Sequence, residues 1–90
     1  MRFEYDPNKS ASNKEKHGID FEEAQALWDD PDAIEVPLGY EDEPRYVVVG
    51  VLGGKHWSAI CTDRGDAIRI ISFRRAHKKE EAAYENCKGC

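Results

Sequence analysis

Three apolar runs in the second half of the chain, joined by two tight turns, constrain its fold more than any other feature. Residues 45–52 form the most β-rich run, and Gly53-Gly54 is a turn dipeptide typical of a hairpin. Residues 56–62 predict the returning strand. A second turn at residues 63–66 leads into another predicted strand at residues 67–73. These connections are too short for crossovers, so the sequence predicts three consecutive antiparallel strands.

The flanking segments carry helix signals. The Asp6-Pro7 pair is typical of a helix start, and Gly18 predicts its end as a left-handed C-cap. Asp20 is expected to cap a second helix, because the apolar side chains within residues 21–28 recur at helical spacing. A third helix is predicted from about residue 76 to residue 87.

The predicted element order defines the fold class. Short strands are also expected near residues 3–5 and 33–36, so strands and helices are segregated along the chain. We therefore expect an α+β fold in which a small antiparallel meander sheet has its helices packed on one face. Ninety residues allow one domain, expected over residues 1–86, followed by a short C-terminal tail at residues 87–90.

Composition limits the cellular setting and the cofactor chemistry. No apolar run is long enough to span a bilayer and the first residues lack a signal-peptide core, so we expect a soluble cytoplasmic protein without membrane contact. Cys87 and Cys90 form a terminal CKGC pair, which could bind metal or do redox chemistry. A frayed tail with two thiols is the favoured alternative, because no second pair of ligands exists. We expect no metal and no cofactor.

Charge is segregated along a chain whose formal net charge is −5. Residues 20–43 contain ten acids and no Lys or Arg, whereas residues 67–79 contain five Lys or Arg and no acid. A second basic cluster lies within residues 9–17. A local basic surface can attract a polyanion even when the whole chain is acidic, and the acidic half could repel nucleic acid or dock a basic partner.

Arginines near the strand ends are the strongest candidates for binding phosphate. Arg74 and Arg75 leave the last predicted strand toward opposite sides, and a guanidinium fork matches a phosphate bidentately. Arg69, on the same strand, needs an acid or a phosphate as partner. Arg45 and Arg64 could complete a cradle with this pair, although Arg64 could equally be an ordinary turn residue.

Sequence patterns spread along the chain carry a family resemblance. They are YDPNK at residues 5–9, NKEKHGIDFEEA at 13–24, Asp30-Pro31, TDRGDAIRIISFRRA at 62–76, Glu80, and Tyr84-Glu85. In this order and at these spacings, they resemble the BrnT family, the ribonuclease toxins of type II toxin–antitoxin systems, over about residues 2–86. The chain departs from the usual pattern at His77, where the family has a small polar residue, and at Lys78-Lys79.

The resemblance implies a fold, an activity and a partner. The fold would be similar to that of RelE-type toxins, and the activity would be metal-independent cleavage of RNA that inhibits translation. A DNA-binding antitoxin would neutralise the toxin in a hetero-oligomer, and operator DNA would be bound only through that antitoxin. The alternative is a non-catalytic module that binds the antitoxin and co-represses the operon.

Metal-independent RNA cleavage by the 2′-OH needs a base, an acid and cations around the phosphate. Histidine suits the proton transfers. His17 could be the base or acid, or it could only cap the C-terminus of the first helix, where the helix dipole favours a positive charge. His77 could be a base or incidental. Glu80 could orient the ring of His77 or pair with Arg75, and Tyr84 could stack a base, donate a hydrogen bond, or pack between helix and sheet.

Lysines complete the predicted site. Lys9 and Lys16 on the first helix, and Lys78 on the last, are expected to contact phosphates. Lys78 could instead only solubilise its helix. His56, which precedes an apolar strand, is expected to be structural.

Overall fold

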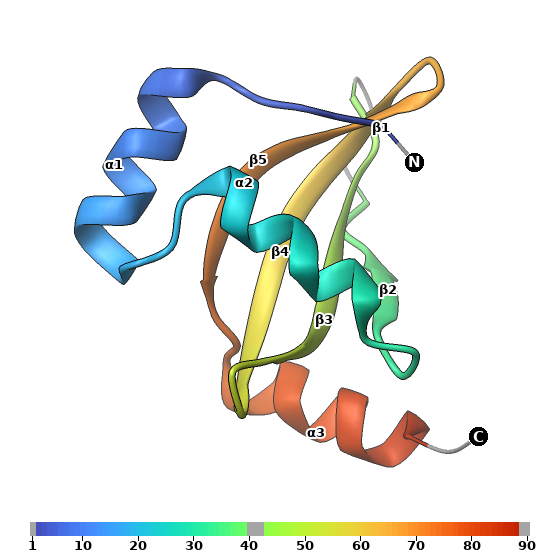
Figure 1. The fold of residues 1–90 in the computed structure, drawn as a ribbon. Helices are drawn as coiled ribbons and strands as arrows, with labels where there is room; N and C mark the ends of the chain where they lie inside the picture. Colours follow the sequence, from blue (N-terminus) through green and yellow to red (C-terminus); the bar gives the residue numbers. More distant parts are fainter. Residues whose placement is uncertain (1, 40–42, 89–90) are drawn as a thin grey trace.

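The computed structural model describes residues 2–39 and 43–88, in which a five-stranded sheet is flanked by helices (Figure 1). The strands lie in the order β1-β5-β4-β3-β2. In chain order the elements are β1 (Arg2–Glu4), α1 (Pro7–His17), α2 (Phe21–Ala24), the 3-10 helix η1 (Gln25–Asp29), β2 (Ile34–Pro37), β3 (Arg45–Leu52), β4 (Lys55–Arg64), β5 (Ala67–Arg75) and α3 (Lys78–Cys87).

The sheet confirms the α+β class and corrects one part of the predicted topology. Strands β2 to β5 form consecutive antiparallel pairs, as expected. Strand β1 instead pairs in parallel with β5, with Phe3 opposite Ile68, so the sheet is mixed. The physical reason is that Asp6 and Pro7 start a helix directly after β1. The chain therefore cannot form a hairpin there, and β1 pairs with a distant strand.

Helix boundaries follow the predicted caps. The Asp6 carboxylate accepts a hydrogen bond of 2.8 Å from the Asn8 amide, and Gly18 ends α1 with φ of 78°. Asp20 and Glu23 form a capping box with bonds of 2.8 and 3.0 Å. The predicted second helix is divided, because only its first turn is α-helical and the rest is the tighter η1.

The main core lies between the sheet and the segment formed by α2 and η1. Phe21 and Leu27, each at most 1% exposed, pack against the strand row that includes Ala59 and Cys61. Burial of each large side chain contributes about 1.5–3 kcal/mol. Gly50 allows the close approach, because a Cβ there would lie 3.1 Å from the side chain of Leu27.

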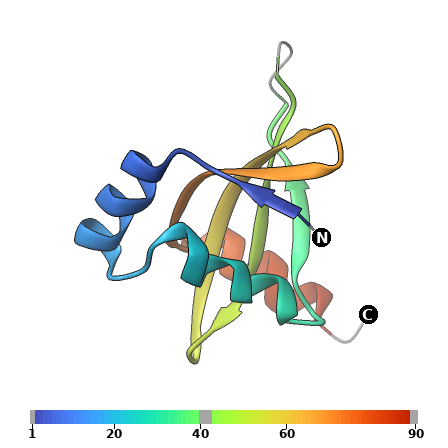
Figure 2. The same ribbon diagram turned by 45° about the horizontal axis from the view of Figure 1, so that its top comes forward.

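The opposite face of the sheet is covered in part by α3, so the expectation that all helices pack on one face is wrong. Tyr84, 2% exposed, packs with Val47 and Val49 on that face, while Val48 points into the main core. Figure 2 shows α2 and α3 on opposite sides of the strands. Both rows of β3 are apolar, and successive side chains alternate between faces. Each face therefore needs its own cover.

Helix α1 lies along the edge of β5 beyond the end of β1. The buried Asn13 side chain donates to the Ile19 carbonyl at 2.8 Å and accepts from the Phe73 amide at 3.4 Å. Ser10, also buried, accepts a 2.9 Å hydrogen bond from the Phe21 amide. Polar side chains therefore attach this helix, which explains why its sequence has almost no apolar stripe.

Candidate functional site

Internal ion pairs occupy several of the predicted phosphate-binding arginines. The Arg69 guanidinium lies 3.4 Å from the Glu4 carboxylate, so the partner that this arginine requires is an acid within the chain. Arg45 and Arg64 lie 3.9 and 3.8 Å from the carboxylate of Glu43. Exposed pairs of this kind contribute little to stability, about 0–1 kcal/mol, but they reduce the local positive charge.

The structure also separates Arg45 and Arg64 from Arg74 and Arg75. In the β4–β5 register, Arg75 lies opposite Trp57, whereas Arg64 lies seven positions further along β4. At about 3.3 Å per residue, the two ends of the sheet are about 23 Å apart. The expectation that these four arginines form one cradle is therefore corrected.

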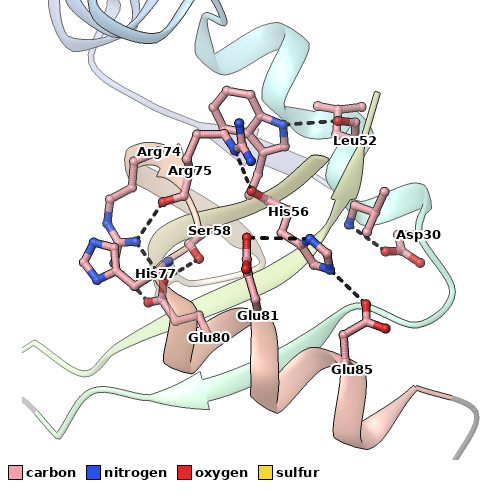
Figure 3. Close-up of polar contacts among 12 residues, drawn as sticks. Asp30, Leu52, His56, Ser58, Arg74, Arg75, His77, Glu80, Glu81 and Glu85 are labelled. Carbon is pink, nitrogen blue, oxygen red and sulfur yellow. Dashed lines mark hydrogen bonds and ion pairs between the residues drawn. The ribbon is translucent and has the colours of Figure 1, made fainter. Parts of the chain in front are cut away.

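Arg74 binds Glu80 bidentately (Figure 3). Its two terminal nitrogens lie 2.8 and 3.0 Å from the two carboxylate oxygens of Glu80. Glu80 also accepts hydrogen bonds from the Ser58 hydroxyl at 2.9 Å and the His77 amide at 2.8 Å. These donors, Arg74 first, lower the pKa of Glu80 to about 2. The sequence suggested that Glu80 orients the His77 ring or pairs with Arg75. Its carboxylate instead binds Arg74 and so joins α3 to the sheet, while Glu80 and His77 share a capping box.

Arg75 is in a different environment on the opposite face of β5. Its guanidinium carbon lies 5.6 Å from the centre of the Trp57 ring, and its Nε donates to the His56 carbonyl at 3.1 Å. Its two terminal nitrogens have no partner among residues 2–39 and 43–88. One edge of the guanidinium is thus fixed while the other faces solvent, a suitable arrangement for binding phosphate.

A basic pocket lies between α1 and β5. Its volume is about 170 Å³, and none of the described residues around it is acidic. Lys9, Lys16 and His17 have no ion-pair or hydrogen-bond partner for their side chains within the described part of the chain. Small-molecule sites are usually about 300–1,000 Å³, so this pocket suits one phosphate group better than a whole nucleotide. The lining residues are Lys9, Ser12, Asn13, Lys16, His17, Phe21, Ile71 and Ser72.

Asn13 positions this pocket, although sequence reasoning assigned it no role beyond the family pattern. It joins α1 to β5 and lines the cavity directly. A signal existed in the sequence: Lys9, Asn13 and Lys16 lie at positions i, i+4 and i+7, and so share one helix face. The bonds of Asn13 to both neighbouring segments could not be read from that spacing.

Tyr84 occupies the packing position that was one of its three alternatives. Its hydroxyl donates to Asp30 at 2.8 Å, and burial followed by this bond raises its pKa to about 12. A ring that is 2% exposed has no free face on which an RNA base could stack. We therefore interpret Tyr84 as a residue that holds α3 rather than a catalytic group.

The start of α3 carries exposed basic groups, and its later turns meet His56. His77 and Lys78 are exposed; His77 is the N-cap of α3 in a capping box with Glu80, whereas the Lys78 side chain has no partner in the described residues. The His56 ring lies 2.9 Å from Glu85 and 3.8 Å from Glu81, with both carboxylates on α3 (Figure 3). This geometry fits the structural role expected for His56.

Other features of the described residues can be stated briefly. They contain no cluster of three or more His, Cys, Asp or Glu side chains arranged to hold a metal ion. Cys87 is exposed at the end of α3, whereas Cys90 of the CKGC pair lies outside the described residues. Within the same ranges, no helix combines the length and the apolar character needed to cross a membrane.

A family model matches residues 5–80, and its description is the ribonuclease toxin, BrnT, of type II toxin–antitoxin systems. The chain belongs to the BrnT family. A search of curated proteins found no match. The match extends from residue 5, just before α1, to Glu80, so the BrnT region contains both groups of unpaired cations: those of the basic pocket and those where β5 meets α3. Membership in a type II system also implies a cognate antitoxin as partner.

Proposed function

We propose that this BrnT toxin is a metal-independent endoribonuclease that cleaves RNA by attack of the 2′-OH and inhibits translation. A DNA-binding antitoxin neutralises it in a hetero-oligomer. Family membership supports ribonuclease activity in general. The acid-free basic pocket between α1 and β5 is the observation that carries the proposed site, because three unpaired basic side chains there match the charge of a phosphate.

The pocket residues divide into phosphate-binding and proton-transfer groups. Lys9 and Lys16 bind the phosphate at the cleavage point, and their charges stabilise the crowded phosphorane that forms during attack. His17 lines the same pocket and transfers a proton, because histidine is the side chain that most often serves as a general acid or base. The hydroxyl of Ser72 is a further hydrogen-bond donor from β5.

A neighbouring phosphate binds where β5 meets α3. Arg75 lies three positions after Ser72 on β5 and offers its free guanidinium edge, while Lys78 adds a mobile charge. Arg74 is not needed for this contact, because Glu80 already binds its fork. The RNA strand thus follows the edge of β5 from the pocket toward α3.

Cleavage of a labelled RNA by the purified protein tests the activity and the site together. We expect cleavage to persist in EDTA and the Lys9→Ala/Lys16→Ala variant to lose at least about tenfold in kcat/KM. Lys14→Ala is the matched control, because Lys14 lies on the same helix but pairs with Glu23 at 2.7 Å. Equal losses in the double variant and the control would reject the pocket.

The role of His17 is tested by the rate of the chemical step. His17→Gln is expected to lower kcat by about 10²–10⁴, with little change in RNA affinity. An unchanged kcat would assign proton transfer to another residue. If the wild-type protein does not cleave RNA but its antitoxin complex binds operator DNA, the chain is instead the non-catalytic co-repressor.

A further inference from the structure

The acidic half of the molecule also keeps unpaired charges. Glu22, Asp29, Asp32 and Glu35 have no Lys, Arg or His within ion-pair distance among residues 2–39 and 43–88. They belong to α2, η1, β2 and the connection between them, and residues 20–39 contain no Lys or Arg. This side of the protein therefore has an uncompensated negative field, which attracts basic partners and repels nucleic acid.

The strand on that side also exposes apolar surface. Val36 and Leu38 are 36% and 40% exposed, and they are the large apolar side chains that the described residues leave most open to solvent. They follow Ile34 at two-residue spacing and so share its face of the sheet. On that face Ile34 packs against the buried cluster of Val47, Val49 and Tyr84. Figure 1 shows α3 crossing the other end of that face, so an apolar row continues beyond its helical cover.

Strand β2 is also an edge with free backbone groups. The Leu38 amide donates to the Arg45 carbonyl at 2.9 Å, which places residues 34, 36 and 38 in bonding positions toward β3. In an antiparallel pair the intervening residues point away, so the N–H and C=O of Glu35 face the open edge. Helix α1 protects the opposite edge of the sheet through Asn13, and β2 has no comparable cover among the described helices.

We propose that the β2 edge, defined as Glu35, Val36 and Leu38, binds an extended segment of the cognate antitoxin whose apolar side chains are flanked by Lys or Arg. Backbone bonds to Glu35 would orient that segment, and Val36 and Leu38 would bury its apolar side chains. Pro37 lacks an N–H, which keeps the added ladder short. This inference rests on the toxin–antitoxin pairing of the proposed function. A second copy of this chain fits poorly, because two identical acidic edges repel each other.

Binding of the purified full-length antitoxin to full-length toxin variants tests the surface. Val36→Ser/Leu38→Ser should raise the equilibrium Kd at least about tenfold, because the complex would lose the burial of these two apolar side chains. Glu35→Lys should mainly lower the association rate and its salt dependence. Glu15→Lys is the matched control, since Glu15 is exposed on α1 and makes the same charge change away from β2. Thermal unfolding checks that every variant is folded.

The outcomes separate this proposal from the ribonuclease proposal. An unchanged Kd for the folded serine variant would overturn the β2 surface. Light scattering that shows a wild-type dimer abolished by the same substitutions would overturn it too, because the occupant would then be a second copy. The free serine variant should still cleave RNA like the wild type. If no version of the protein cleaves RNA while the loss of antitoxin binding remains, the ribonuclease proposal fails and the docking surface stands.

Discussion

Two adjacent arginines with the same side-chain chemistry have different roles because strand alternation places them in different surroundings. Arg74 projects toward α3 and meets the carboxylate of Glu80 with both terminal nitrogens. Arg75 projects to the other face, over Trp57, and keeps its terminal nitrogens free within the described residues. A guanidinium whose terminal nitrogens are already paired with a carboxylate serves as a structural contact. One that is held only through its Nε can still donate from its terminal nitrogens to a ligand.

The Glu80 contact has a stability consequence that depends on pH. Glu80→Gln removes the charge from a carboxylate that accepts four hydrogen bonds, so we expect a loss of about 1–3 kcal/mol in the free energy of unfolding. The pKa of Glu80 is lowered from 4.5 to about 2, so this stabilisation is present above about pH 4.5 and is lost as the pH falls through 2.

Urea unfolding of wild type and variant between pH 7 and pH 2 measures this effect. The stability difference should shrink over the acidic part of that range. Glu15→Gln is the control, because the exposed Glu15 side chain has no partner in the described residues. A Glu80→Gln variant as stable as wild type at pH 7 would contradict the structural role of Arg74.

At the scale of elements, the attachment of α1 to the edge of β5 creates the pocket. This helix has no apolar stripe, so hydrophobic burial alone would not hold it against the sheet. Asn13 instead satisfies a free backbone group on each side, the Ile19 carbonyl and the Phe73 amide. The same contact closes a sheet edge and brings Lys9, Lys16 and His17 next to Ile71 and Ser72.

Replacement of Asn13 should therefore affect stability and RNA binding together. Asn13→Ala leaves two backbone groups without their side-chain partner, and we expect a loss of about 1–3 kcal/mol in the free energy of unfolding. Faster hydrogen exchange of the Phe73 amide should accompany it, with weaker RNA binding. Asn8→Ala, in the exposed first turn of α1, is the matched control. Unchanged exchange at Phe73 would show that Asn13 does not hold this edge.

At the scale of the molecule, net charge conceals a separation of charge. The formal value of −5 sums an acidic side around α2, η1 and β2 with a basic edge along β5. Glu4 pairs with Arg69, and the single carboxylate of Glu43 lies near both Arg45 and Arg64, so these acids offset part of the positive charge of the sheet. The molecule therefore carries two surfaces of opposite sign, a basic edge along β5 and an acidic side around α2, η1 and β2.

This separation predicts how RNA binding responds to salt. If the pocket binds one phosphate and Arg75 with Lys78 binds a second, a plot of log K against log salt should have a slope of about −1.4, since each single-strand contact contributes about −0.7. Filter binding of a single-stranded RNA at several salt concentrations between about 50 and 300 mM measures this slope, because log K falls linearly with log salt. A slope near zero would mean that these cations do not bind RNA.

Elements that depend on local interactions could be predicted from the sequence alone. Asp6, Gly18 and Asp20 act on amides or backbone angles within a few residues, and the glycine turns fix the three central strands. Spacing and charge along the chain also nominated Lys9, Lys16 and His17 as site candidates. The sequence motifs predicted membership in the BrnT family, which the family match confirms.

Which charges are paired and which faces of the sheet are covered depends on contacts between segments that are distant in the sequence. The partner of Arg69 is Glu4, 65 residues away, and that of Phe73 is Asn13, 60 residues away. The placement of α3 opposite α2 likewise depends on how both rows of β3 are buried. Such contacts form between segments that share no local pattern, so spacing along the chain can nominate a cation for phosphate but cannot show that an acid already holds it.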